Sequence, residues 1–210
     1  MKKINFNKAQ YTNSSVSCKT YPQDLGHEVA IVGRSNVGKS SLINKLTGYK
    51  RLAKVSKTPG RTQCINFFDI ENENIVDYPL RLVDLPGYGY AAVHASVQEK
   101  WDSMMAEYLT KRKSLKGLLL IIDIRHLLKK LDLELLTFAK QINVPIHLIL
   151  NKSDKLSKNK IHQSESKLRK ELKAQIGDLQ QNNISVQVFS ASNGSGVLEL
   201  EDLLCSWLLP

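Results

Sequence analysis

Residues 33–40 read Gly-Arg-Ser-Asn-Val-Gly-Lys-Ser, two glycines with four residues between them, followed directly by lysine and serine. Glycines with this spacing let successive backbone N–H groups turn into an anion-sized hollow. Lys39 can then reach the β- and γ-phosphates of a nucleotide, and the Ser40 hydroxyl can bind magnesium. The segment predicts a phosphate-binding loop. Its candidate nucleotide contacts are Gly33, Arg34, Ser35, Asn36, Val37, Gly38, Lys39 and Ser40.

A second set of residues has the Asp-x-x-Gly form and follows an apolar run typical of a strand. Asp84 would hold magnesium through water, and the Gly87 N–H would contact the γ-phosphate. A threonine hydroxyl from an upstream loop is expected to complete the magnesium coordination, and Thr58 and Thr62 both qualify on spacing alone. The nucleotide contacts expected here are Asp84, Leu85, Pro86 and Gly87.

A third set predicts which base is bound. Asp154, in an Asn-Lys-Ser-Asp run, can accept hydrogen bonds from the N1–H and the exocyclic amine of guanine. Adenine offers no matching donors, so ATP would leave the carboxylate unpaired, which is costly. The backbone after the last apolar strand suits a contact with the guanine oxygen. The candidate base contacts are Asn151, Lys152, Ser153, Asp154, Phe189, Ser190 and Ala191.

Two residues depart from the pattern of the best-known GTPases. Many of these carry a glutamine directly after Asp-x-x-Gly, where it orients the attacking water. Tyr88 stands there in this chain, so we expect slow unaided hydrolysis. In translation-related GTPases an asparagine placed like Asn36 helps to hold a potassium ion where an arginine finger's charge would act. The alternative is that Asn36 only braces the loop. The expected catalytic contributors are Lys39, Asn36 and Gly87.

The apolar pattern predicts the elements that position these residues. Short apolar runs alternate with helical segments, which indicates an α/β fold with a mostly parallel sheet and helices on both faces. We expect one P-loop domain with six strands at residues 27–210, preceded by an arm or edge segment at 1–26. The expected strands are 29–32, 65–70, 80–83, 118–123, 146–150 and 186–189, and the expected helices are 39–46, 97–111, 131–141, 164–176 and 197–208.

Composition narrows the class of protein. A hydrophobic share of 42% is typical of globular domains, and no apolar run approaches the length of a bilayer span. The polar start lacks a signal-peptide core, and three scattered cysteines match no metal or redox spacing, so we expect a cytoplasmic protein.

The net charge of +10 favours a polyanionic partner. Residues 152–173 hold eight bases and three acids, although such a run is often only a solvated helix face.

With these motifs in place, the chain resembles the EngB (YihA or YsxC) family of bacterial ribosome-assembly GTPases, within the TrmE-Era-EngA-EngB-septin-like superfamily. The resemblance extends from about residue 14 to the final helix. Lys-Thr-Pro-Gly-Arg-Thr-Gln and Asp-Leu-Pro-Gly-Tyr-Gly-Tyr-Ala are far more specific than the general GTPase motifs. The matching stretches are 33–44, 57–63, 82–91, 123–126 and 151–154.

This resemblance implies an EngB-type GTP-binding domain that binds GTP, GDP and Mg²⁺ and hydrolyses GTP during late assembly of the large ribosomal subunit. It also implies a need for the protein in normal cell division and septation. The implied partner is the large-subunit precursor or its ribosomal RNA, bound by a monomer, with neither DNA nor membrane involved. The resemblance favours Thr62 over Thr58 as a magnesium ligand. The residues it assigns to switch I are Gly60, Arg61, Thr62, Gln63 and Cys64.

A second hypothesis stays open at this stage. The chain could be a nucleotide-regulated division factor that binds a protein partner directly, with GTP turnover incidental to that role. Binding to ribosomal particles that depends on GTP and on salt would separate the two hypotheses.

Overall fold

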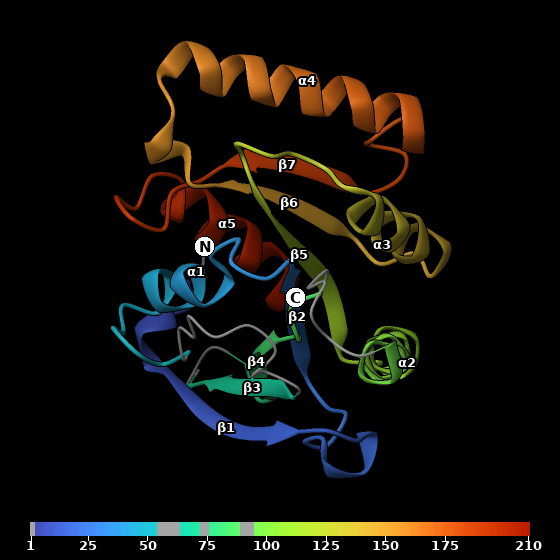
Figure 1. The fold of residues 1–210 in the computed structure, drawn as a ribbon. Helices are drawn as coiled ribbons and strands as arrows, with labels where there is room; N and C mark the ends of the chain where they lie inside the picture. Colours follow the sequence, from blue (N-terminus) through green and yellow to red (C-terminus); the bar gives the residue numbers. More distant parts are fainter. Residues whose placement is uncertain (1–2, 54–63, 72–75, 89–94) are drawn as a thin grey trace.

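The computed structural model of the chain describes residues 3–53, 64–71, 76–88 and 95–210. Its centre is a seven-stranded sheet with the order β1-β3-β4-β2-β5-β6-β7 (Figure 1). β3 runs antiparallel to both of its neighbours, and the remaining strand pairs are parallel. The strands are β1 (Ala9–Ser15), β2 (His27–Gly33), β3 (Ile65–Ile70), β4 (Leu80–Asp84), β5 (Leu115–Asp123), β6 (Ile146–Asn151) and β7 (Ile184–Val188).

Helices cover both faces of this sheet. The core on one face includes side chains of α2, α3 and α4, and the core on the other face includes side chains of α1 and α5. Along β5, Leu118 and Leu120 point into the first core, whereas Leu119 points into the second. A strand buried on both sides must be apolar throughout, which explains why this run does not alternate. The helices are α1 (Lys39–Leu46), α2 (Ala95–Lys111), α3 (Lys130–Gln141), α4 (Lys158–Ile176) and α5 (Val197–Leu208).

The expectation of six strands was wrong by one. The seventh is β1, which pairs with β3 and makes part of the N-terminal segment an edge strand rather than an irregular arm. Only its two end residues, Ala9 and Ser15, are buried, and its pairing with β3 is irregular between Tyr11 and Asn13. An edge strand that faces water along most of its length carries little apolar alternation for sequence analysis to detect.

The helix boundaries agree with the sequence pattern where the apolar period is strong. α1 and α5 begin and end at the expected residues, whereas α4 begins six residues before the expected 164. The first turns of α4 are almost entirely polar, with Ile161 as their one apolar residue, so their helical period is weak. Among the described residues, no helix has both the length and the apolar character that a bilayer span requires.

A buried carboxylate joins three parts of the fold at the amino end of β2. The Glu28 side chain is fully buried and sits between two arginines. Arg112, immediately after α2, donates from Nη2 to Oε1 at 2.6 Å and from Nε to Oε2 at 2.9 Å. Arg81 of β4 donates to Oε1 at 3.1 Å, and the Tyr108 hydroxyl donates to Oε2 at 2.8 Å. One carboxylate therefore links α2, β2 and β4.

The same arginines also attach the segment that leads into β2. Arg112 donates to the backbone oxygens of Pro22 and Gln23, and Arg81 donates to those of Gln23 and Leu25. These bonds satisfy the charged donors that burial would otherwise leave unpaired. Burial alone would lower the pKa of Arg112, but the hydrogen bonds and charge of Glu28 outweigh it and raise the pKa.

We expect Glu28→Gln to lower the free energy of unfolding by about 3 kcal/mol or more, because two buried guanidinium groups lose their counter-charge. Urea denaturation followed by circular dichroism measures this loss. The matched control is Glu165→Gln, which breaks a pair with Arg169 on the surface of α4 and should cost less than about 1 kcal/mol. Equal losses for the two variants would contradict the structural role of Glu28.

Candidate nucleotide-binding site

The predicted nucleotide contacts come together at the carboxyl edge of the sheet. The phosphate loop follows β2, residues 85–88 follow β4, residues 152–154 follow β6, and residues 189–191 follow β7. These four strands run parallel in one sheet, so their carboxyl ends share an edge, which is where ligands bind in such folds. Val37, Leu85 and Phe189 are buried, so their side chains belong to the core and only their backbones can contact a ligand.

Part of the expected site lies outside the described residues. This applies to Gly60, Arg61, Thr62 and Gln63 of the expected switch I, and to the other candidate threonine, Thr58. Cys64 is described; it is half-buried and lies immediately before β3.

The phosphate loop has the backbone shape that its glycines predict. Gly38 has φ of +102°, and a Cβ placed on it would lie 2.3 Å from the Nδ2 of Asn151. Only glycine fits such a close approach at a positive φ. Asn36 also has a positive φ, of 64°. The loop leads directly into α1, whose first residue is Lys39.

Lys39 and Asp84 meet at the carboxyl ends of β2 and β4. The Lys39 ammonium is hydrogen-bonded to Oδ1 of Asp84, and both side chains are largely buried. The other carboxylate oxygen, Oδ2, accepts a hydrogen bond from Asn66 at 3.3 Å. Asn66 in turn accepts from Ser14 of the edge strand at 2.5 Å. Sequence analysis missed Asn66, whose only signal is its position near the start of β3.

Side chains after β6 hold the phosphate loop. Asn151 donates from Nδ2 to the Val37 oxygen at 2.9 Å. Lys152 donates to the Asn36 oxygen at 2.6 Å. Asn151 also accepts from the Ala191 N–H at 3.1 Å, so this N–H, expected to face the guanine oxygen, is hydrogen-bonded within the protein. The loop of residues 151–154, expected to contact the base and called the base-reading loop below, therefore forms one connected unit with the phosphate loop.

Asp154 is prepared as a hydrogen-bond acceptor. Its Oδ1 accepts from the Ser190 hydroxyl at 2.6 Å, and its Oδ2 lies 3.0 Å from the Lys155 ammonium. The hydrogen bond from Ser190, together with Lys155, lowers the pKa of Asp154. The carboxylate therefore stays ionised at neutral pH, which is the form that accepts two hydrogen bonds from guanine.

Asp123 positions the lysine of the base-reading loop. It ends β5 level with Asn151 of β6, and its Oδ2 lies 3.0 Å from the Lys152 ammonium. Burial alone would raise the pKa of Asp123, but hydrogen bonds from Arg125 and Lys152 outweigh it and hold the pKa well below its usual range. In the sequence, Asp123 appears only as the last residue of the expected strand 118–123 and the first of the matching stretch 123–126, with no assigned contact. The signal was its place on the strand adjacent to β6.

Tyr88 is directed away from the phosphate loop by a buried acid. Its hydroxyl donates to Oδ1 of Asp132 at 2.6 Å, and Arg34 Nε lies 3.1 Å from Oδ2 of the same carboxylate. Burial, with the charge of Asp132, raises the pKa of Tyr88 well above its usual range. The tyrosine backbone also stays on the phosphate loop, because its oxygen accepts from the Ser35 N–H at 3.2 Å. Residue 88 thus joins the phosphate loop to α3.

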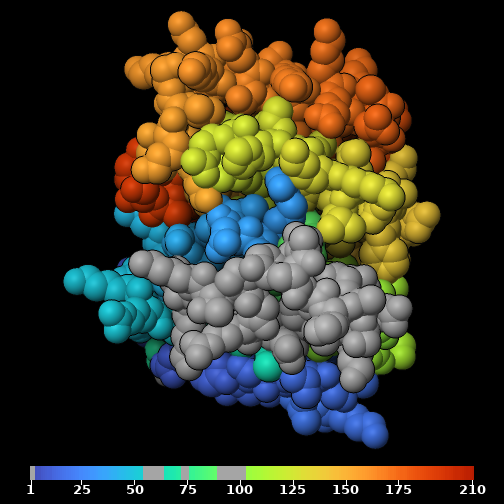
Figure 2. Space-filling view, in the orientation of Figure 1, coloured from blue at the N-terminus to red at the C-terminus, as the bar shows by residue number. Residues whose placement is uncertain are grey.

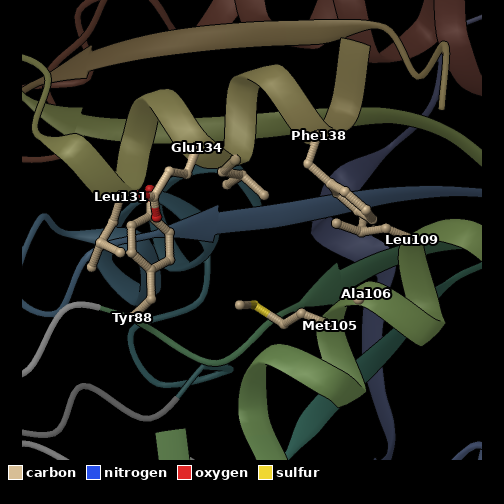
Figure 3. A pocket seen from close by; sticks show the side chains of 8 residues that line it. Tyr88, Met105, Ala106, Leu109, Leu131, Glu134 and Phe138 are labelled. Carbon is tan, nitrogen blue, oxygen red and sulfur yellow. The ribbon is translucent and has the colours of Figure 1, made fainter. Parts of the chain in front are cut away.

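The ring of Tyr88 also lines an apolar cavity of about 240 Å³ between α2 and α3. Figure 3 shows Tyr88 and Leu131 side by side at one end of this cavity and Phe138 with Leu109 at the other. The ring is therefore packed among helix side chains, as its 4% exposure indicates.

We expect Asp123→Asn to weaken GTP and GDP binding in parallel, by about tenfold, because Lys152 loses a charged hydrogen bond. The two nucleotides should be affected equally, since Lys152 lies at the base-reading loop and not beside Asp84. Titration with fluorescent GDP and a GTP analogue measures both affinities. Arg125→Gln is the control, because it leaves the pair of Asp123 and Lys152 in place. Unchanged affinities in Asp123→Asn would show that Asp123 does not contribute to nucleotide binding.

Comparison with known proteins agrees with this geometry. Residues 28–152 match the family described as 50S ribosome-binding GTPase. A probable GTP-binding protein EngB from Stenotrophomonas maltophilia is 45% identical over 201 residues, which cover 96% of each chain. The same-named protein from Coxiella burnetii is 42% identical over 202 residues, covering 96% of this chain and 93% of that one.

Solved structures share the fold. The crystal structure of a probable GTP-binding protein EngB aligns with a TM-score of 0.63 at 22% identity, over 86% of this chain and 98% of that chain. Era, crystallised with MgGDPNP and nucleotides 1506–1542 of 16S ribosomal RNA, aligns with a TM-score of 0.69 at 24% identity, over 88% of this chain and 57% of that chain. The protein is a GTPase, and it belongs to the EngB family of GTP-binding proteins.

Proposed function

We propose that this GTPase is a slow, magnesium-dependent switch in assembly of the large ribosomal subunit, and that cells need it for normal division and septation. The observation that carries the proposal is the joining of Lys39, Asp84 and Asp154 at one sheet edge in a chain of the EngB family. The description of the matched family includes binding to the 50S ribosome. We propose that the partner is the large-subunit precursor or its ribosomal RNA, bound by a monomer in the cytoplasm. Neither DNA nor membrane has a role in this proposal.

The residues present fit a magnesium ion. Ser40 and Asp84 offer a hydroxyl and a carboxylate, which are hard oxygen ligands of the kind that magnesium prefers. The Ser40 side chain makes no hydrogen bond within the described part of the chain, and Asn66 orients the carboxylate of Asp84. We propose that Ser40 and Thr62 bind the ion and that Asp84 holds it through water. The bound ion would neutralise charge on the β- and γ-phosphates.

Catalysis in this proposal depends on fixed charge and on backbone donors. Lys39 stabilises negative charge on the β- and γ-phosphates, and the Gly87 N–H contacts the γ-phosphate. Tyr88 cannot orient water as a glutamine does, because its hydroxyl is held by Asp132 in the protein interior. This arrangement supports a low intrinsic rate. GTP contacts with Gly87 and with residues 60–64 of switch I would order these loops and so couple nucleotide to partner binding.

Asn36 is a candidate potassium ligand. Its side chain is exposed and makes no hydrogen bond within the described residues, while its backbone oxygen accepts from Lys152. A side chain that bonds to nothing in the loop gives little support to a purely bracing role. We propose that it helps to hold a potassium ion beside the phosphates, where the added positive charge would stabilise the transition state.

Potassium should raise GTP turnover about tenfold or more over sodium at matched ionic strength, and Asn36→Ala should remove the difference. Phosphate release measured under saturating GTP gives both rates. Binding of GDP serves as the control for folding of the variant. Equal rates in the two salts, unaltered by the substitution, would rule out a potassium site at Asn36.

Co-sedimentation with purified large-subunit precursors tests the ribosomal role. With a non-hydrolysable GTP analogue, the protein should pellet with the particles, and rising salt should release it. Lys39→Ala and Asp154→Ala should abolish the dependence on nucleotide, because they remove the phosphate and guanine contacts. Failure to bind any ribosomal particle at low salt would favour the second candidate, a nucleotide-regulated division factor with a protein partner.

A further inference from the structure

Helix α4 carries an unusual share of the positive charge of this protein. Its 19 residues include six Lys or Arg and two Glu. The other helices do not share this excess to the same degree: α5 has three acids and no base, and α3 has two of each. α4 forms an outer layer of the molecule, at the opposite end from β1 (Figures 1 and 2). This peripheral helix therefore carries a net charge of +4, out of +10 for the whole chain.

Four of the five lysines of α4 occupy one side of the helix. With 3.6 residues per turn, Lys160, Lys167, Lys170 and Lys173 fall within an arc of about 140°. This arc excludes the buried Leu168, Leu172 and Ile176. All four are exposed, and they extend over 14 residues, or about 20 Å of helix. We call these four residues the α4 lysine face.

The acids of α4 do not neutralise this face. Glu165 lies toward the core side, where it pairs with Arg169 at 2.8 Å, and Glu171 is half-buried. Within the described part of the chain, none of the four lysines forms an ion pair. Their charges are thus available to a partner.

The chemistry of the surrounding residues distinguishes among polyanionic partners. On the same side of the helix lie Gln163, Ser166 and Ala174, all exposed, and no aromatic or large apolar side chain. Protein interfaces are enriched in aromatic residues, Met and Arg and depleted of Lys, and a membrane-bound helix needs an outward apolar face. Phosphate backbones are bound by lysine with polar neighbours, which can also reach ribose hydroxyls.

We propose that the α4 lysine face binds the phosphate backbone of duplex RNA on the large-subunit precursor. The inference rests on the proposed ribosomal function and names the surface that serves it. The helix begins three residues after the turn Ser153–Lys155 of the base-reading loop, so RNA bound along it would approach the nucleotide site. Phosphate contacts of this kind position a protein without reading sequence.

The test compares two variants of equal net charge. One replaces the four residues of the face, Lys160, Lys167, Lys170 and Lys173, with Gln. The control replaces four exposed lysines from other parts of the chain, Lys3, Lys19, Lys113 and Lys130, with Gln. Binding is measured to a 20-base-pair RNA hairpin and to purified large-subunit precursors, in the presence of a GTP analogue and over a range of salt concentrations. GDP affinity and thermal unfolding check that both variants fold.

The face variant should bind both probes about tenfold or more weakly near 0.15 M salt, and its slope of log K against log salt should become shallower by about 3. The control should stay within about threefold of the parent. Equal behaviour of the two variants would overturn the inference while leaving the ribosomal role intact. A parent protein that binds no ribosomal particle would instead contradict the proposed function.

One further outcome would reassign the surface. If the face variant loses binding to the precursor particles but the parent does not bind the hairpin, the partner of the face is an acidic protein and the RNA assignment is wrong.

Discussion

The phosphate loop of this protein is held by side chains from the Asn-Lys-Ser-Asp loop that follows β6. Asn151 and Lys152 donate to the backbone oxygens of Val37 and Asn36, and Asp123 holds the Lys152 ammonium. Gly38 permits this approach because a Cβ there would meet Asn151. A loop that presents several N–H groups to phosphate binds it less well if its backbone conformation fluctuates. Side chains at the carboxyl ends of β5 and β6 therefore fix the positions of the phosphate loop and of the loop 151–154 together.

The loop after β4 is held in place differently, through the buried side chain of its last described residue. Tyr88 is bound to the phosphate loop through its backbone and to α3 through its hydroxyl, with Asp132 shared between Tyr88 and Arg34. A buried carboxylate with several partners resists displacement, since removing one partner leaves charge unpaired. The residue at the position that other GTPases use to orient water serves here as a structural link between the phosphate loop and α3.

The charged side chains described here fall into two groups, one buried and paired and the other exposed and unpaired. The buried charges, such as Glu28 with its arginines, are paired and join secondary-structure elements, whereas the lysines along the outer side of α4 have no acidic partner within the described residues. Paired charges stabilise the fold, and unpaired exposed charges increase solubility and attract polyanions. The nucleotide edge and the basic helix are adjacent because α4 starts close to the base-reading loop.

The sequence alone determined the nucleotide chemistry and most of the fold. The nucleotide motifs are short local patterns, recognised by the spacing of their glycines and by the order in which Lys39, Asp84 and Asp154 follow one another along the chain. The apolar runs of β2, β5 and β6 reflect burial on both faces of the sheet. Tertiary structure alone showed that β1 completes the sheet, that Asn66 orients Asp84, that Asp123 holds Lys152 and that Asp132 turns Tyr88 inward. Each of these is a contact between residues far apart in the chain, and pairs of polar side chains have no periodicity by which a sequence could reveal them.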